Sequence, residues 1–429
     1  MPVRNNDIYY EQDRRAPTTH LTMVFHGAGT QQDPEGKCGL ARFAAKLLFR
    51  GTQKMGREEI ARRLELLGAD AGAFVTETDF VVSLHGFTKS LGEALELVAT
   101  ILSDAAFPED ELALLKKSEL NQLEALFQDP ERFLSAGHQF VVYDGKEIGK
   151  VGSREGIASI SREDVLEFFR KAKASAVLYF TAISDLPEGE LEQFLARIID
   201  ERRTDGFTIL PEVHFTEPET RRAAIIHSAE AKNDRLIWSH AGIGAADERR
   251  FALGLVVDAL GSFEGYLFDE LRNKKGWCYG AYAYVVPGTT RPGRIGYYAD
   301  PAQENSVLLI PELLRLLREF PASEGFLGRL RERNETFKNR YAYQLDPKFR
   351  LASRVHFDRY GVPILGRKEY NDRIDAVTIE SVQRVVGELF DTSRMAMVFH
   401  GDRDRITRAL AAADPEIAVT VLQKEELVA

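Results

Sequence analysis

The stretches IASISREDVLEFF (157–169) and IDAVTIESVQRVV (374–386) decide the fold, because they are two copies of one pattern in a single chain. In each, a Ser or Thr (Ser161 or Thr378) precedes apolar residues at helical spacing, which is typical of a helix and its N-cap. An apolar run follows each helix, AVLYFTAIS (176–184) or MAMVFHGD (395–402), and favours a strand. A helix and a strand that recur together indicate an internal duplication.

Five pairs of matching residues, three within these stretches and two before them, keep the same separation of 217 positions. The pairs are Pro130 with Pro347, Tyr143 with Tyr360, Ile157 with Ile374, Ser161 with Thr378, and Val165 with Val382. In both halves, strand patterns such as FVVSLHGF (80–87) and RIGYYAD (294–300) alternate with long amphipathic helices such as SLGEALELVATILSDA (90–105). The sequence therefore predicts an α+β fold of two homologous domains in tandem, each a mixed or antiparallel sheet packed with helices.

The two halves are joined by the stretch RTDGFTILPEVHFTEPETRR (203–222). This stretch has two prolines, many polar residues and little periodicity, which is typical of an extended linker. We predict an N-terminal domain at 1–203, a linker at 204–220 and a C-terminal domain at 221–429.

The composition excludes several classes of partner. The 429 residues are 44% hydrophobic and 28% charged, as in a soluble globular protein, and the net charge is −10. An acidic chain without a basic patch does not favour nucleic acid or an anionic membrane. Only Cys38 and Cys278 are present, too few for a disulfide framework, so we expect buried thiols in a reducing compartment. The sequence predicts a cytoplasmic protein, or a periplasmic one if a leader has been removed.

One helix has the frame of a zinc site without its ligands. In GLARFAAKLLFRGT (39–52), apolar residues at helical spacing form a core face, and Gly51 ends the helix. A zinc helix of the inverted H-x-x-E-H type needs histidine at the first and fifth positions and glutamate at the fourth. Those positions hold Arg42, Ala45 and Lys46. Two fixed cations repel a divalent ion, so we predict that this chain holds no metal there.

The longer stretch DPEGKCGLARFAAKLLFRGT (33–52) resembles the signature of the insulinase-like, or pitrilysin-type, zinc metallopeptidases, the family of mitochondrial processing peptidase. The matching residues are Gly39, Leu40, Ala41, Phe43, Phe49, Gly51 and Thr52. The resemblance implies a duplicated chain of this length, and its departures fall on the catalytic positions. The family's third zinc ligand is a glutamate on a later helix. Spacing from Lys46 places it at Leu123, whereas alignment on the Asp129–Pro130 turn places it at Gln122.

A second segment keeps the family's pattern. YLFDELRNKKGWCYGAYAY (266–284) resembles the C-terminal-domain motif F-x-x-L-R-x-x-x-G-x-x-Y. The matching residues are Phe268, Leu271, Arg272, Gly276 and Tyr279. The resemblance implies that Arg272 and Tyr279 bind the substrate backbone and stabilise the tetrahedral intermediate. We expect a helix that ends near Lys275, with Gly276 as its cap, and a strand from about Tyr279, so that the two side chains converge.

These patterns lead to one main functional hypothesis. The resemblance implies a dimer, because members of the family often work as dimers of two-domain subunits, and in a heterodimer one subunit can lose its zinc and still supply its Arg and Tyr to the other. The sequence thus predicts a non-catalytic subunit of a heterodimeric zinc peptidase, with zinc, H-x-x-E-H and the peptide substrate's scissile bond in a homologous active partner. The alternatives are a structural or peptide-binding member with no part in proteolysis, a homodimeric chamber without hydrolysis, and activity with an unconventional metal. Arg42 and Lys46 are either solvated charges or partners of carboxylates.

Overall fold

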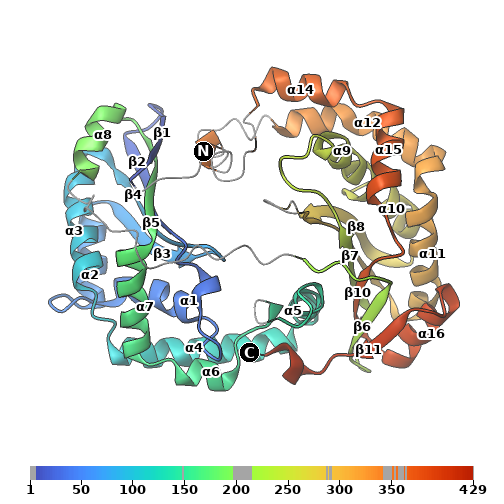
Figure 1. The fold of residues 1–429 in the computed structure, drawn as a ribbon, viewed down its shortest axis with the longest axis horizontal. Helices are drawn as coiled ribbons and strands as arrows, with labels where there is room; N and C mark the ends of the chain where they lie inside the picture. Colours follow the sequence, from blue (N-terminus) through green and yellow to red (C-terminus); the bar gives the residue numbers. More distant parts are fainter. Residues whose placement is uncertain are drawn as a thin grey trace.

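The structure, a computed structural model, describes residues 6–146, 149–196, 215–286, 288, 292–341, 350–351, 354–355, 362 and 365–428. Two α+β domains face each other, each with a sheet on the inner side and most of its helices on the outer side (Figure 1). This arrangement confirms the predicted fold class.

The first domain is built on a five-stranded sheet in the order β1-β5-β2-β4-β3 among the described residues. β1 and β5 are parallel, and the other neighbours are antiparallel. The strands are β1 (Ile8–Gln12), β2 (Thr18–His26), β3 (Ala69–Val75), β4 (Asp79–Phe87) and β5 (Val177–Ser184). The helices are α1 (Leu40–Leu47), α2 (Arg57–Leu66), α3 (Leu91–Asp104), α6 (Arg154–Ser159), α7 (Arg162–Ser175) and α8 (Glu188–Leu195). Apolar residues on one face of the sheet and the facing sides of these helices form one buried core.

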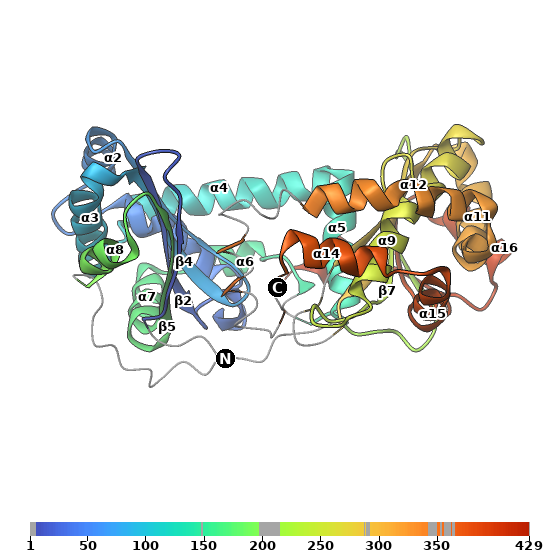
Figure 2. The same ribbon diagram turned by 90° about the horizontal axis from the view of Figure 1, so that it is seen from above.

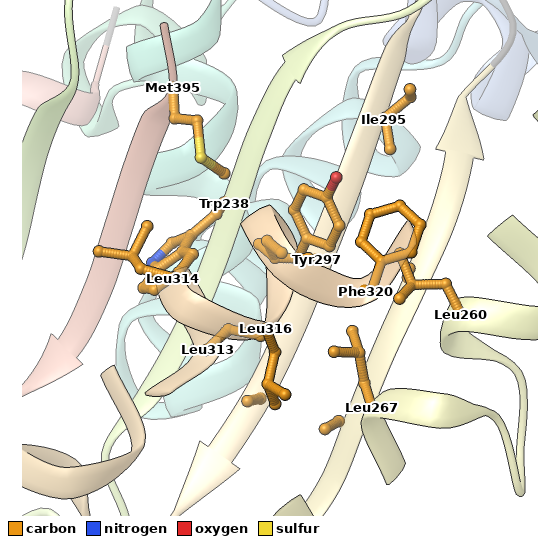
Figure 3. Packing of buried hydrophobic residues seen from close by; sticks show 14 of the residues in the cluster. Trp238, Leu260, Leu267, Ile295, Tyr297, Leu313, Leu314, Leu316, Phe320 and Met395 are labelled. Carbon is orange, nitrogen blue, oxygen red and sulfur yellow. The ribbon is translucent and has the colours of Figure 1, made fainter. Parts of the chain in front are cut away.

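The second domain has six strands in the order β11-β6-β10-β7-β9-β8 among the described residues. The strands are β6 (Arg222–His227), β7 (Arg235–Ala241), β8 (Cys278–Val286), β9 (Arg294–Pro301), β10 (Ala396–Gly401) and β11 (Ala418–Val421). The helices are α9 (Arg250–Gly261), α10 (Tyr266–Phe268), α11 (Ser306–Glu319), α12 (Glu324–Tyr341), α14 (Arg367–Asp375), α15 (Ile379–Leu389) and α16 (Arg403–Ala413). Figure 3 shows the core, where Trp238 and Tyr297 of the sheet lie against leucines of α11.

The two sheets have the same topology, as the internal duplication predicts. The order β1-β5-β2-β4-β3 corresponds to β6-β10-β7-β9-β8, and β11 is added beside β6. The pair β6/β10 is parallel, as is β1/β5. Ser161 and Thr378 are the N-caps of α7 and α15, and each forms a reciprocal capping box with the third helical residue. The repeated stretches 157–169 and 374–386 therefore occupy equivalent places in the two domains.

A long helix connects the domains. α4 (Glu109–Gln128) leaves the first domain and leads into α5 (Pro130–Val142), which covers the inner face of the second sheet (Figure 2). Leu134 and Val142 of α5 are buried against β6 and β10. His138 Nε2 lies 2.9 Å from Ser239 Oγ of β7. Although α5 belongs to the first half by sequence, it completes the core of the second domain.

In the same way, a segment of the second half covers the inner face of the first sheet. Leu351 and Val355 are buried on the inner face of the first sheet, against Val24, Val81 and Tyr179. Nearby, Arg354 Nη1 donates a hydrogen bond of 2.7 Å to a backbone carbonyl oxygen of β1. Leu351 lies 217 positions after Leu134 of α5, so the same part of each repeat covers the other repeat's sheet. Neither sheet is fully covered by its own half, and we expect the halves to fold as one interlocked unit.

Most of the predicted linker, residues 204–214, lies outside the described residues. Residues 215–220 have neither helix nor strand, and the domain boundaries stay a prediction. Among the described residues, one continuous stretch, Arg250–Asn273, has the length and hydropathy of a membrane span. However, 78% of its most apolar window is buried inside the protein, as in a core helix. Short turns complete the fold: 3₁₀ turns at Thr30–Gln32, Leu48–Arg50, Thr88–Ser90, Gln303–Asn305, Phe320–Ala322 and Lys424–Leu427, and a π turn at Asp269–Asn273.

Candidate functional site

Helix α1 begins at a cap that the sequence analysis missed. Gly39 precedes the helix with φ +98°, a conformation that favours glycine. The carboxylate of Asp33 accepts hydrogen bonds from the backbone N–H groups of Gly39 (2.7 Å) and Ala41 (2.8 Å). Burial raises the pKa of Asp33 to about 6, and the two backbone donors oppose that rise. Asp33 therefore fixes the start of the helix that carries the zinc-site positions.

The two cations of α1 meet a carboxylate of their own chain. Lys46 Nζ lies 2.6 Å from Oε1 of Glu119 on α4, and Arg42 Nη1 lies 3.8 Å from its Oε2. The side chain of Glu119 is 8% exposed, against 51% for Arg42 and 39% for Lys46. Since a buried carboxylate needs a partner, the cations stabilise a charge that would otherwise be costly. The sequence predicts that Arg42 and Lys46 are either solvated charges or partners of carboxylates. The structure favours pairing, and the carboxylate, that of Glu119, belongs to this chain.

The other predicted positions lie around this ion pair. Ala45 is buried in the first core, and its methyl side chain has no group for acid–base chemistry. Gln122 is exposed and donates a hydrogen bond of 3.3 Å to Ser118 Oγ. Leu123 packs against the core of the first domain. Glu124 points elsewhere, to Arg154 at 2.5 Å.

The residues around α1 do not fit a zinc ion. Zn²⁺ in proteins is held by three or four Cys, His, Asp or Glu ligands, whereas the carboxylate that faces α1's cations, Glu119, is already paired with them. In the part of the chain that the structure describes, no group of three or more such residues is placed to hold a metal. The sequence carries no specific signal for Glu119, because two partly exposed cations one helical turn apart can equally be solvated.

In the second domain, the structure brings Arg272 and Tyr279 together. Arg272 lies in the π turn Asp269–Asn273, and the helix ends at Gly276, which has φ +69°. The N–H of Gly276 donates to the carbonyl oxygen of Arg272 (2.8 Å), and that of Trp277 donates to Leu271 (3.0 Å). β8 begins at Cys278, so the expected helix end, glycine cap and strand start are confirmed.

Two local irregularities set the directions of these side chains. The π turn changes the direction of Arg272, and a break in the β8–β9 register between Cys278 and Ala281 changes that of Tyr279. The guanidinium carbon of Arg272 lies 4.4 Å from the ring centroid of Tyr279 and 5.2 Å from that of Phe268. Arg272 also donates a hydrogen bond to the carbonyl oxygen of Tyr279. Tyr279 as a whole is 69% exposed, so its phenol is available to a ligand.

The edge of the first sheet forms a groove beside the ion pair. β3 is the edge strand, and a groove of about 600 Å³ runs between it, α1 and α2. Lys46 lines this groove at one side, and the small residues of β3 from Ala69 to Ala73 line the other. An unpaired strand edge with small side chains can accept an extended peptide by main-chain hydrogen bonds. β8, which follows the Arg272 turn, is the edge strand of the second sheet.

Family comparisons agree with this architecture. Residues 7–140 match the family described as Insulinase (Peptidase family M16), and residues 159–325 match the Peptidase M16 inactive domain. The two matches together span most of the chain, and the second begins in the last part of the first domain and extends into the second domain. The chain belongs to the insulinase-like M16 peptidase family.

Individual relatives are distant in sequence. An uncharacterized zinc protease of Streptomyces coelicolor is 21% identical over 299 residues, which are 67% of this chain and 64% of that protein. The β subunit of the mitochondrial processing peptidase of Rattus norvegicus is 24% identical over 165 residues, 38% of this chain and 34% of that subunit. A crystal structure of a peptidase M16 inactive domain from Pseudomonas fluorescens has the same fold, with a TM-score of 0.77, 20% identity and coverage of 94% and 97%.

Proposed function

We propose that this chain is the zinc-less subunit of a heterodimeric M16 peptidase and that it supplies Arg272 and Tyr279 to the active site of a metal-bearing partner. One observation carries the proposal: the chain lacks the family's zinc ligands but retains the family's Arg and Tyr pair. At α1 an ion pair takes the place of the ligands, whereas Arg272 and Tyr279 converge through a π turn and a strand irregularity.

The chemistry of the retained pair suits peptide hydrolysis. Attack of water on a peptide carbonyl places negative charge on the carbonyl oxygen. A guanidinium and a phenol are strong hydrogen-bond donors toward such an oxygen, and they act best when held in place beforehand. Stacking on Phe268 and the bond to the Tyr279 carbonyl hold the guanidinium of Arg272. The partner, an H-x-x-E-H homologue, would contribute zinc and the water that attacks.

The ion pair at α1 explains why the frame of a zinc site persists. Lys46 and Glu119 connect α1 to α4, the helix that leads to the second domain. Loss of zinc ligands alone would leave Glu119 buried without a partner. The two cations thus keep the chamber wall folded in a subunit that needs no metal of its own.

A second candidate is a peptide-binding member of the family that takes no part in proteolysis. The groove beside β3 favours it, because an edge strand can bind an extended chain without any catalytic group. In that case Arg272 and Tyr279 bind the peptide backbone and no partner is needed.

Reconstitution separates the two candidates. The chain and a homologue of similar length that retains H-x-x-E-H are purified separately from the same source, and hydrolysis of an unstructured peptide is followed while their ratio is varied. The first candidate predicts little turnover by either protein alone and a maximum at equal amounts. Full activity of the homologue alone, unchanged by addition of this chain, would exclude the supporting-subunit role. A stable homodimer of this chain that binds peptide favours the second candidate.

A further inference from the structure

A second, smaller cavity lies on the other side of the ion pair from the β3 groove. Its volume is about 170 Å³, and α1, α4, α5 and residues 150–152 line it. Arg42 and Glu119 border this cavity, whereas Ala45 and Lys46 border the groove. The two spaces therefore flank one cluster of side chains.

The charges around the cavity are mostly positive. Arg42, Arg132 and Lys150 line it together with one carboxylate, Glu119, and a second carboxylate, that of Asp33, accepts a hydrogen bond from the N–H of Gly39 at the same cavity. Glu119 is already bonded to Lys46 at 2.6 Å. Among the residues that the structure describes, no acidic group lies within ion-pair distance of the Arg132 guanidinium, and Arg42 reaches Glu119 only at 3.8 Å. Two guanidinium groups from different helices thus border one space with hydrogen-bond donors in excess.

Most of the remaining lining is apolar. Phe43, Leu123, Leu126 and Ile157 form an apolar side, here called the floor of the cavity, and Gln122 adds one polar side chain. The segment at its rim is held in place, because the N–H of Val151 donates a 2.8 Å hydrogen bond to the carbonyl oxygen of Leu427. The cavity is smaller than the roughly 300–1,000 Å³ of sites that enclose a drug-sized ligand. It therefore has room for one end of a longer ligand, with an apolar part against the floor and an acceptor at the arginines.

We propose that this cavity binds a carboxylate carried by a peptide, with Arg42 and Arg132 as the groups that recognise it. Planar guanidinium groups match carboxylates in geometry and charge. Because both spaces border the Lys46–Glu119 pair, a peptide that lies along β3 and passes this pair would bring its end to the cavity. The favoured source of the carboxylate is therefore the C-terminus of the peptide, after an apolar last residue. The inference rests on the proposed peptide chamber and specifies which peptides it accepts.

The test measures binding to the isolated full-length chain, without any turnover. A fluorophore-labelled hexapeptide that ends in leucine is prepared as the free acid and as the C-terminal amide, and anisotropy gives both dissociation constants. We expect the acid to bind about tenfold more tightly, since a hydrogen-bonded charge contributes about 1.5 kcal/mol or more. Arg132→Gln and, separately, Arg42→Gln should each remove most of that difference. Arg403→Gln, which changes an exposed arginine at the start of α16, is the matched control and should keep it.

The outcomes are distinct. Equal affinity of acid and amide for the wild-type chain overturns the inference, as does an acid preference that survives in both arginine variants, or no peptide binding at all. An amide peptide with an internal glutamate that binds as tightly as the free acid supports the carboxylate site but assigns it to a side chain. Reduced salt should widen the difference between acid and amide. If that difference is absent while the reconstituted complex still depends on Arg272 and Tyr279, only this inference fails.

Discussion

Replacing Lys46 by methionine tests the role of the ion pair at α1. Methionine keeps an unbranched apolar stem and removes the ammonium group that lies 2.6 Å from Glu119 Oε1. The carboxylate remains, with its side chain 8% exposed and with Arg42 as its nearest cation at 3.8 Å. The change therefore leaves a buried charge with one distant partner.

The magnitude lies between two limits. Removing one partner of a fully buried pair costs about 3–5 kcal/mol, whereas an exposed pair contributes about 0–1 kcal/mol. Lys46 is 39% exposed and Arg42 remains, so we expect Lys46→Met to lower the free energy of unfolding by about 2 kcal/mol. Because the two halves interlock, the whole chain of 429 residues unfolds together, and at about 2.1 cal/mol/K per residue that loss lowers Tm by about 2 °C.

A double-mutant cycle isolates the pair. Lys46→Met, Glu119→Gln and the double variant are compared by urea unfolding at neutral pH, with Arg403→Gln as a surface control. Because Glu119→Gln removes the charge that Lys46 neutralises, the double variant should lose less stability than the sum of the single losses, by about 1 kcal/mol or more. Additive losses, or a Lys46→Met loss below about 0.5 kcal/mol, would refute the structural role of the pair.

Three further changes have defined outcomes. Burial lowers the pKa of His138 to about 3, below its unfolded value near 6.5. The unfolded chain therefore binds an extra proton below about pH 6.5, and the free energy of unfolding falls by up to about 1.4 kcal/mol per pH unit between about pH 6.5 and pH 3. His138→Leu removes this proton uptake and should flatten the dependence of stability on acid pH. Gly137→Val should lower the free energy of unfolding, measured in urea, by about 1–3 kcal/mol. Even a Cβ at this position would lie 2.7 Å from an isoleucine methyl group of β6. Unchanged stability would contradict the close packing of α5 on the second sheet. The triple variant Arg42→His, Ala45→Glu, Lys46→His should bind one zinc ion per chain, with the α4 carboxylate as third ligand, as measured by calorimetry; no gain over wild type would mean that this carboxylate is misplaced.

Much of the fold follows from the sequence because its cues are local. The capped helices that begin at Ser161 and Thr378, and the strands after them, are set by residues close together in the chain. The exchange of α5 for the segment that contains Leu351 is different. An amphipathic pattern shows that a helix has a buried face, but it does not show which sheet covers that face.

The candidate site divides in the same way. The cap at Gly276 and the strand after it are local, and the sequence analysis placed them correctly. The contact of Lys46 with Glu119 joins residues 73 positions apart, and its discovery needed the packing of α4 on α1. The strand irregularity that directs Tyr279 has no sequence signal of its own, because it depends on how β8 pairs with β9.

The central claim is that Arg272 and Tyr279 act in the active site of a partner subunit. The most direct measurement is kcat for peptide hydrolysis by the purified complex that carries Arg272→Ala or Tyr279→Phe in this chain, at equal zinc content and equal subunit ratio. Loss of one preorganised donor to an oxyanion typically lowers kcat by about 10²–10³-fold, so we expect a fall of that order, while Arg403→Ala on α16 leaves kcat unchanged. Wild-type kcat in both variants would contradict the account.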